Sequence, residues 1–257
     1  MARFDKLEIG SPGAEPQTGC SPAGEEHNAT WWMKQADEQR RCGWYENALR
    51  YYSRALEEDK SQVAGWVGQV QMLIALDEPN EADLWSRKAL ELFPAHGDLL
   101  AGRAQARCRL GDFKQAFTLS DGAFQQEGNS AYRWLVRGEI QVAGAKDTDR
   151  HCFDKAQLVD ADWLVPLEIA LVYWHYERPG LGLPRAGRAI EAAPDRYYAW
   201  YVQGLMQFEL GMNGPARKSL QRCLELSPQH RDAQQRLFEL DNRGWSLRRA
   251  VRRLFRS

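Results

Sequence analysis

Residues 199–228 read AWYVQGLMQFELGMNGPARKSLQRCLELSP, and this stretch decides the fold. Apolar residues recur through two segments of about a dozen residues at the three-to-four-residue spacing of a buried helix face. Leu210–Gly211 separates the two segments, and Pro228 closes the second one where a helix should stop. The stretch therefore predicts two helices joined by a tight turn.

The same pattern returns along the chain with a period close to 34 residues. Large residues are spaced by 34 from Trp32 through Trp66 and Leu100 to Trp134, and by 34 again from Pro166 to Trp200. Four positions after each stands a small or β-branched residue: Ala36, Val70, Ala104, Gly138, Ala170 and Gly204. A second small-residue series comprises Ala55, Ala89, Ala123, Ala156, Ala189 and Cys223. Small residues let two helices approach closely, and one pair cannot bury its apolar face alone, so the pairs are expected to stack.

This pattern resembles the tetratricopeptide repeat family over roughly residues 29–230. The unit at 199–228 is the most similar, although Cys223 stands where the family usually has alanine. The resemblance implies an all-α, right-handed α-solenoid of about six helix-turn-helix repeats. The fourth unit is about two residues short around 145–148, and the fifth has Pro166 at a usually bulky position and a Pro/Gly-rich turn at 178–182. After Pro228, Arg231 to Arg243 is predicted to form a capping helix.

Charge divides the chain into three predicted parts. Lys and Arg number 34 against 35 Asp and Glu, a net charge of -1, which disfavours an electrostatic nucleic-acid binder. Residues 1–28 hold two basic and five acidic side chains, net -3, with several prolines and glycines, and are predicted to be a disordered tail. Residues 29–243 form the repeats with their cap. Residues 244–257 hold five arginines and no acid, net +5.

The five cysteines follow no pattern, which argues against a disulfide framework and against a zinc site. The N-terminus has no apolar core of a signal peptide, and no apolar run is long enough to span a bilayer. We therefore expect a cytoplasmic protein.

Motifs for catalysis are missing from the sequence. None of the five histidines stands in a metal-ligand spacing, and no phosphate-binding loop or nucleophile elbow occurs. His151 and Cys152 are adjacent, but neighbours on a helix point apart. We predict a non-enzymatic protein without a catalytic site, cofactor or metal.

In the tetratricopeptide repeat family, which this sequence resembles, the first helices of successive pairs line a concave groove that binds a segment of a partner protein. Carried over by repeat position, the groove is expected to contain three cationic points, Arg40, Arg41 and Arg109. Its C-terminal half is expected to be aromatic and aliphatic, with Leu167, Leu171, Trp174, Tyr198, Tyr201, Leu205 and Phe208. Such side chains would anchor an apolar residue of a protein or peptide partner. The alternative is that some of them pack inside the superhelix. The resemblance thus implies an interaction scaffold or adaptor that supports assembly of a complex.

Residues 246–257 suggest a second surface. Leu247, Val251 and Leu254 recur at helical spacing, with Gly244 as a predicted break before them and Ser246 as a predicted N-cap. The opposite rows consist of Arg248, Arg249, Arg252, Arg253 and Arg256. Such a basic amphipathic helix can bind an anionic membrane surface or an acidic partner, and less plausibly nucleic acid, which would make the protein a membrane-surface or nucleic-acid-associated adaptor. Alternatively, its apolar stripe packs on the last repeat and its arginines keep the cap soluble.

Overall fold

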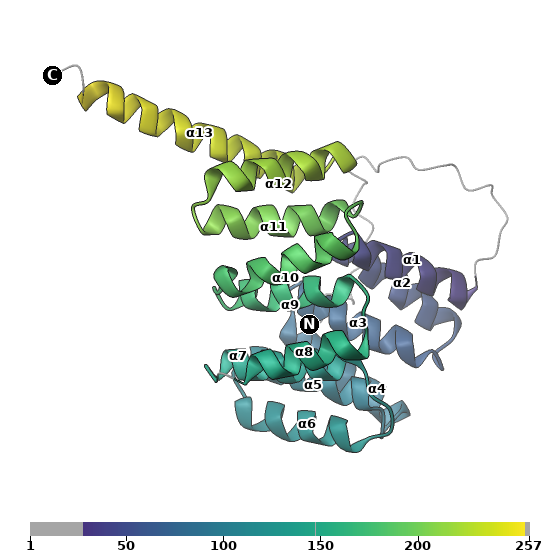
Figure 1. The fold of residues 1–257 in the computed structure, drawn as a ribbon. Helices are drawn as coiled ribbons and strands as arrows, with labels where there is room; N and C mark the ends of the chain where they lie inside the picture. The colour runs from purple at the N-terminus through teal and green to yellow at the C-terminus, as the bar shows by residue number, and fades with distance from the viewer. Residues whose placement is uncertain (1–27, 147, 255–257) are drawn as a thin grey trace.

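The computed structural model describes the backbone of residues 28–146 and 148–254, with side chains described up to residue 242. Within these ranges the chain forms thirteen helices and no strand (Figure 1). The first helices of the successive pairs are α1 (Ala29–Arg41), α3 (Val63–Ala75), α5 (Gly97–Arg109), α7 (Ala131–Ala143), α9 (Leu164–His175) and α11 (Tyr197–Glu209). The second helices are α2 (Tyr45–Glu58), α4 (Pro79–Leu92), α6 (Phe113–Gln125), α8 (Asp149–Val159), α10 (Pro179–Ala192) and α12 (Asn213–Leu226). A last helix, α13 (Arg231–Leu254), follows. Six pairs confirm the predicted all-α tetratricopeptide-type solenoid.

The turn inside every pair contains one residue in the left-handed conformation. These residues are Gly43, Asp77, Gly111, Ala145, Glu177 and Gly211, with φ between 52° and 82°. Their spacings are 34, 34, 34, 32 and 34 residues, so the fourth unit is two residues short, as the sequence predicted. A left-handed residue after a helix lets its backbone bond the orphan carbonyl groups of the last turn.

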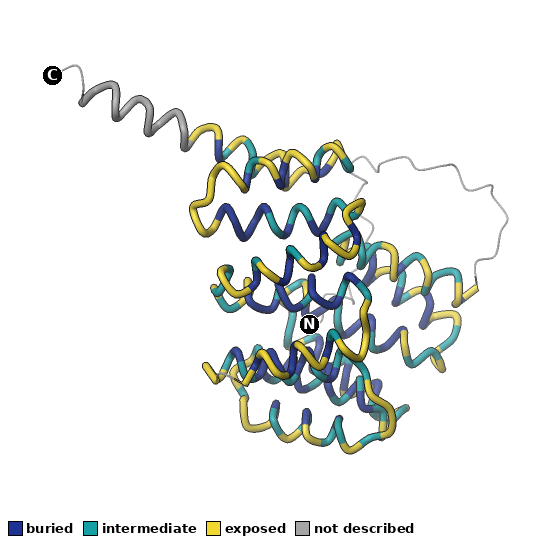
Figure 2. Tube along the Cα trace, in the orientation of Figure 1, coloured by how far each residue is buried: buried dark blue, intermediate teal, exposed yellow. Residues whose placement is uncertain are grey.

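The small-residue series lie where the helices touch. Five of the six members of the second series are alanines and the sixth is Cys223, and all six are fully buried. A Cβ atom on Gly138 would lie 2.3 Å from the Phe153 ring, so only glycine permits the contact between α7 and α8. In the sixth pair, α11 is buried along most of its length, whereas α12 is largely exposed on the outside (Figure 2).

Three of the repeated tryptophans form hydrogen bonds to the segments that connect consecutive pairs. The indole N–H of Trp66 donates to the carbonyl of Lys60 at 3.0 Å, and that of Trp200 to the carbonyl of Pro194 at 2.9 Å. The indole of Trp134 donates to the side chain of Asn129 at 2.9 Å. Each bond ties a first helix to the connection that precedes it, which is a structural role for these large side chains.

The fifth pair is regular despite its prolines. Pro166 lies in the first turn of α9, where the missing N–H has no intrahelical partner in any case. Pro179 is the first residue of α10, so residues 179–182 are helical and the Pro/Gly-rich turn predicted there is wrong. Proline at a first helical position is already fixed near the helical φ, which favours a helix start over a turn.

Helix α13 covers the end of the stack through Ala233 and Leu240, which are buried beside Leu220 and Cys223 of α12. This confirms the predicted cap. The helix continues through Gly244 to Leu254, so the predicted break at Gly244 and the N-cap at Ser246 are wrong. One glycine costs a helix only about 1 kcal/mol relative to alanine, too little to end it alone. Of the predicted acidic tail at residues 1–28, residues 1–27 lie outside the described residues, and Asn28 caps α1.

Candidate functional site

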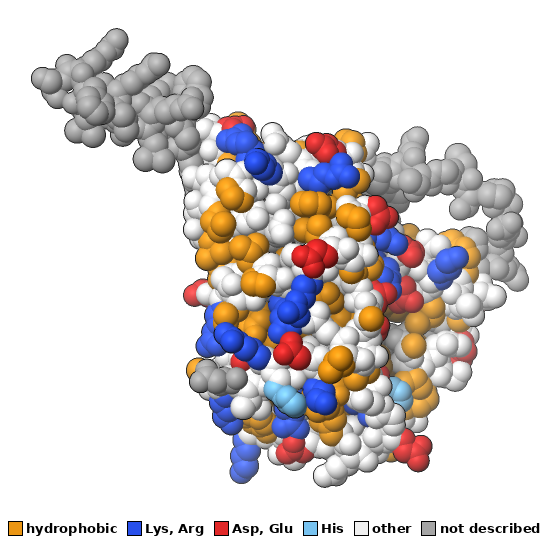
Figure 3. Space-filling model, in the orientation of Figure 1, with side chains coloured by type: hydrophobic (Ala, Val, Ile, Leu, Met, Phe, Trp, Pro, Cys, Tyr) orange, Lys and Arg blue, Asp and Glu red, His pale blue; other side chains and the backbone are white. Residues whose placement is uncertain are grey.

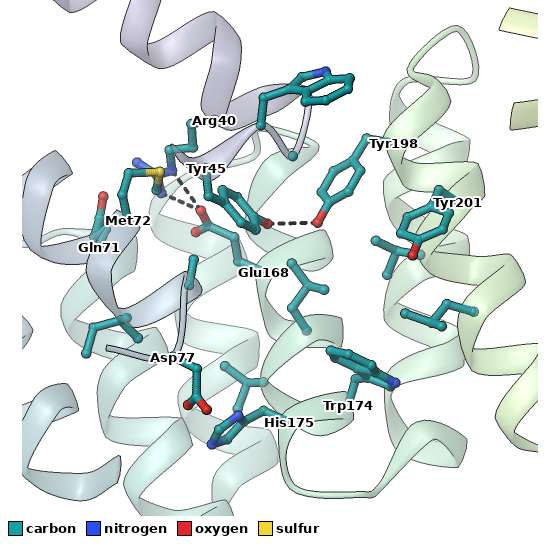
Figure 4. Close-up of a pocket in the computed structure, with 18 of the residues that line it drawn as sticks. Arg40, Tyr45, Gln71, Met72, Asp77, Glu168, Trp174, His175, Tyr198 and Tyr201 are labelled. Carbon is teal, nitrogen blue, oxygen red and sulfur yellow. Dashed lines mark hydrogen bonds and ion pairs between the residues drawn. The ribbon is translucent and has the colours of Figure 1, made fainter. Parts of the chain in front are cut away.

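The first helices of all six pairs face one central cavity of about 1110 Å³. Its wall also includes the turn between α1 and α2 and the first residues of α13. Figure 4 shows side chains from both ends of the solenoid around this space. The two ends of the superhelix meet beside this cavity through the following contacts.

Two ion pairs join the end of α1 to the fifth helix pair. The guanidinium of Arg40 donates to Glu168 of α9, with Nε 3.0 Å from Oε1. Arg41 binds both carboxylate oxygens of Asp162, at 3.0 and 2.6 Å. Burial acts to lower the pKa of Arg40, but the charge and hydrogen bond of Glu168, together with Tyr52, outweigh burial and raise that pKa. Burial also acts to raise the pKa of Asp162, and the hydrogen bonds from Arg41 and the Leu164 N–H reverse this and lower it.

Aromatic side chains continue this contact to the sixth pair. The hydroxyl groups of Tyr45 and Tyr198 share a hydrogen bond of 2.9 Å (Figure 4). The Trp44 indole N–H donates to the Tyr197 hydroxyl at 2.7 Å, and that hydroxyl donates to the carbonyl of Cys42 at 3.1 Å.

Gly43 completes the fit, because it has φ +76° and a Cβ there would lie 2.2 Å from the Tyr198 ring. We call this set the closing contact, formed by Arg40, Arg41, Gly43, Trp44 and Tyr45 against Asp162, Glu168, Tyr197 and Tyr198.

A buried polar network supports the opposite wall. Glu139 of α7 is fully buried and accepts hydrogen bonds from Arg109 at 2.7 Å and Gln105 at 2.5 Å. The Tyr176 hydroxyl lies 3.3 Å from the same carboxylate, and Tyr132 donates to Gln105 at 2.7 Å. A buried carboxylate needs this number of partners, since an unpaired one would be costly.

The structure brings most of the predicted groove residues together, with three exceptions. Cavity-lining positions are occupied by Arg40, Arg109, Leu171, Trp174, Tyr198, Tyr201 and Leu205. Leu167 is fully buried between α9, α10 and α11, and Phe208 is 3% exposed between α11, α12 and α13, so their groove assignment is wrong. Both residues fall on the side of their helix that faces the next pair. Arg41 lies in the closing contact and not on the cavity wall.

The three arginines expected as cationic points, Arg40, Arg41 and Arg109, are each ion-paired within the chain. The aromatic residues differ in access. Trp174 is 39% exposed and Tyr201 is half-buried, whereas Tyr198 is buried. The side chains of Arg248, Arg249, Arg252, Arg253 and Arg256 lie outside the described residues, so the basic C-terminal surface stays a prediction.

The sequence-based prediction missed two acidic residues of the wall, Asp77 and Glu177. Asp77 and Glu177 line the cavity from the left-handed turn positions of the second and fifth pairs, and Glu209 lines it from the end of α11. The sequence contains a signal for these two residues. Asp77 and Glu177 occupy the turn position that glycine occupies in other pairs, at Gly43 and Gly111.

Within the described ranges, no cluster of three metal-ligating side chains is present, and no helix combines the length and apolarity needed to cross a membrane. Cys42, Cys108, Cys152 and Cys223 are unpaired thiols. Burial raises the pKa of Cys108 and of Cys223 to about 12, so neither is a thiolate nucleophile near neutral pH.

Stacked helix pairs with a left-handed turn residue every 34 residues define a helical repeat protein. Comparison with known proteins agrees with this class. Residues 197–230 match the family model of the tetratricopeptide repeat. A search of curated proteins found no match.

Two solved structures are similar in fold. A tetratricopeptide repeat protein from Parabacteroides merdae matches with a TM-score of 0.51 and 15% identity, covering 82% of this chain and 83% of that one. The APC/C hetero-tetramer Cut9–Hcn1 matches with a TM-score of 0.50 and 14% identity, covering 83% of this chain. This chain spans only 43% of the length of that one. Residues 197–230 are thus a tetratricopeptide repeat, and the remaining pairs share the fold of tetratricopeptide repeat proteins.

Proposed function

We propose that this protein is a non-enzymatic scaffold or adaptor that binds a segment of a partner protein in the central cavity and so supports assembly of a complex. One observation carries the proposal: all six first helices contribute to a single cavity of about 1110 Å³. Pockets for small molecules usually measure about 300–1,000 Å³, so this cavity has room for several residues of a peptide.

The chemistry of the wall supports a peptide ligand. Trp174, Leu171 and Tyr201 offer apolar and aromatic surface, which supplies most of the binding free energy at protein interfaces. Gln71 offers an amide group beside it. Amides and aromatic faces bind peptide backbone and side chains without need for a reactive group. The histidines of the wall, His175 and His230, have no nucleophile hydrogen-bonded to them among the described side chains.

Photo-crosslinking tests the proposal. The photoreactive residue p-benzoylphenylalanine replaces Trp174 at the cavity wall in one variant and Leu92, which is 54% exposed on the outer helix α4, in the control. The variants are irradiated in cells, and crosslinked peptides are identified by mass spectrometry. We expect a defined partner segment to crosslink at position 174 and not at position 92. The same crosslinks at both positions would contradict cavity binding.

The affinity of the identified segment then provides a quantitative check. Trp174→Ala removes an exposed side chain and leaves the buried core intact, so the variant is expected to keep its helical circular dichroism. Loss of a central aromatic anchor typically costs an interface about 2 kcal/mol or more. We therefore expect at least a tenfold weaker complex, measured by isothermal titration calorimetry, with Leu92→Ala unchanged.

A further inference from the structure

The charges of the cavity wall do not balance. Its guanidinium groups at Arg40 and Arg109 are already paired with Glu168 and Glu139. No ion pair within the described side chains involves the remaining charged residues of the wall, which are Asp77, Glu177, Glu209, Asp232 and Arg231. Four carboxylates against one guanidinium leave a net negative cavity. His175 and His230 do not offset this at neutral pH, because burial lowers the pKa of both.

Three of these carboxylates line the cavity at the ends of first helices, and we call Asp77, Glu177 and Glu209 the acidic mouth. They stand at the C-terminal ends of α3, α9 and α11, either in the last turn or within two residues of it. The unsatisfied carbonyl groups at a helix C-terminus carry about half a negative charge, which adds to the field of the carboxylates. All three residues are exposed, so they are accessible to a ligand.

Apolar surface lies directly beside the acidic mouth. In Figure 4, the carboxylate of Asp77 lies next to the ring of His175, and the Trp174 indole lies at the neighbouring position on α9. Leu171 and Leu205 line the cavity one turn before Trp174 and Glu209. By contrast, the face of the molecule shown in Figure 3 carries Lys and Arg intermixed with Asp and Glu. An indole face next to carboxylates is a favourable site for a cation.

We propose that the cavity selects a cationic partner segment. A Lys or Arg side chain lies on the Trp174 indole within the acidic mouth, and an adjacent apolar side chain packs on Leu171 and Leu205. This inference rests on the proposed function and adds the charge of the ligand to it. A negatively charged segment is rejected because its carboxylates would meet those of Asp77, Glu177 and Glu209.

The turn geometry supplies a clean variant. Asp77 and Glu177 have φ of 59° and 56°, a conformation that glycine adopts at no steric cost. Asp77→Gly and Glu177→Gly therefore remove charge and preserve the turn, and Glu209→Gln removes the third charge. The matched control is Glu57→Gln, Glu91→Gln and Glu191→Gln, which removes three exposed charges outside the cavity wall on α2, α4 and α10.

The experiment selects peptides from a phage-displayed library of random 12-residue sequences on the full chain. The library is first depleted on the Trp174→Ala variant, which removes peptides that bind elsewhere. We expect the selected peptides to contain Lys or Arg next to Leu, Ile, Phe or Trp. Their affinity, measured by fluorescence anisotropy, is expected to fall about tenfold in the acidic-mouth variant, because three partly exposed charge contacts of a few tenths to 1 kcal/mol each are lost. The matched control is expected to bind like the natural chain.

The outcomes separate this inference from the proposed function. Selected peptides that need Trp174 but are acidic or uncharged, or that bind the acidic-mouth variant equally well, overturn the cationic ligand and leave cavity binding in place. If depletion on Trp174→Ala leaves no peptide that binds the natural chain, binding does not depend on the cavity wall at Trp174, and both proposals fail. An affinity that falls with increasing salt in the natural chain but not in the acidic-mouth variant supports the inference.

Discussion

Consecutive helix pairs meet through a continuous apolar core, to which ion pairs such as Arg107–Asp83 and Arg133–Asp98 are added, whereas the first pair meets the fifth and sixth mainly through ion pairs and hydroxyl groups. The first kind of contact excludes water and cannot separate without exposing apolar surface. The groups of the closing contact are polar or amphipathic, and water can solvate them when the contact opens. Apolar packing therefore stabilises the stack of helix pairs, whereas a smaller set of polar bonds stabilises the closing contact between the two ends.

The largest effect is expected from breaking a contact inside a pair. Phe153→Ala on α8 removes a fully buried ring that packs on Gly138, and such a cavity typically costs about 3–5 kcal/mol. Urea unfolding followed by circular dichroism should show a reduced free energy of unfolding. Leu158→Ala on the same helix is the control, since Leu158 is 78% exposed. Equal losses in both variants would contradict the assigned core.

A glycine pair isolates the closing contact. Gly111→Ala adds a Cβ in open space at φ +82°, so it should cost only the left-handed strain, about 1–2 kcal/mol. Gly43→Ala adds the same strain at φ +76° and drives the Cβ into the Tyr198 ring. We expect Gly43→Ala to destabilise by about 1–3 kcal/mol more than Gly111→Ala, the usual cost of overpacking. Two identical unfolding curves would show that the ends do not meet in solution.

A double-mutant cycle measures the coupling free energy between Arg40 and Glu168, the ion pair that joins the two ends of the solenoid. Arg40→Leu or Glu168→Leu alone should cost about 1.5–3 kcal/mol, because each leaves a partly buried charge without its partner. The double variant should lose less than the sum of the two. The same cycle on Arg217 and Asp241, which are 39% and 59% exposed, should give a coupling below about 1 kcal/mol.

Small-angle X-ray scattering adds a second measurement to that cycle. The radius of gyration should rise in the two single variants of the closing contact and stay constant in those of Arg217 and Asp241. A larger coupling for the exposed pair would reverse the ranking of the two contacts.

The smallest effect concerns pH. His230 packs on Tyr201, Tyr197 and Trp44 beside the closing contact, with Asp232 as the nearby acid. Burial lowers its pKa below the usual value, and Asp232 only partly offsets this. Because the folded pKa is depressed, the contribution to stability is complete above about pH 6.5 and is lost as the pH falls through the folded pKa. His230→Asn keeps an oxygen that can accept the Ala233 N–H and should flatten the pH dependence of unfolding between pH 8 and 5.

The repeats could be predicted from the sequence because the information is local. The 34-residue period, the small-residue series and even the two missing residues of the fourth unit all follow from contacts within one pair or between neighbours. Position in the repeat predicted that Leu171, Trp174 and Tyr201 face the groove, and they line the cavity, while their binding of a partner stays a prediction. The assignment of Leu167 and Phe208 to the groove is wrong because an apolar residue at the edge of the predicted face can point toward the next pair.

Closure of the solenoid could not be predicted in this way. Arg40 and Glu168 are 128 residues apart in sequence, and Trp44 and Tyr197 are 153 apart. Their approach depends on the sum of small rotations from pair to pair, which no single motif encodes. The same long-range arrangement converts Arg40 and Arg41 from expected ligand contacts into internal ones and leaves the acidic residues to set the charge of the cavity.

The closing contact also changes how the array should fold. In an open repeat protein each unit interacts only with its neighbours, so the terminal units fray first and unfolding spreads inward. Here the first unit has a second neighbour at the far end of the chain, which adds contacts of very high sequence separation. Forming them requires closing a loop of more than a hundred residues, so they are expected to form late in folding. Once formed, they make the two ends of the array unfold as one cooperative unit.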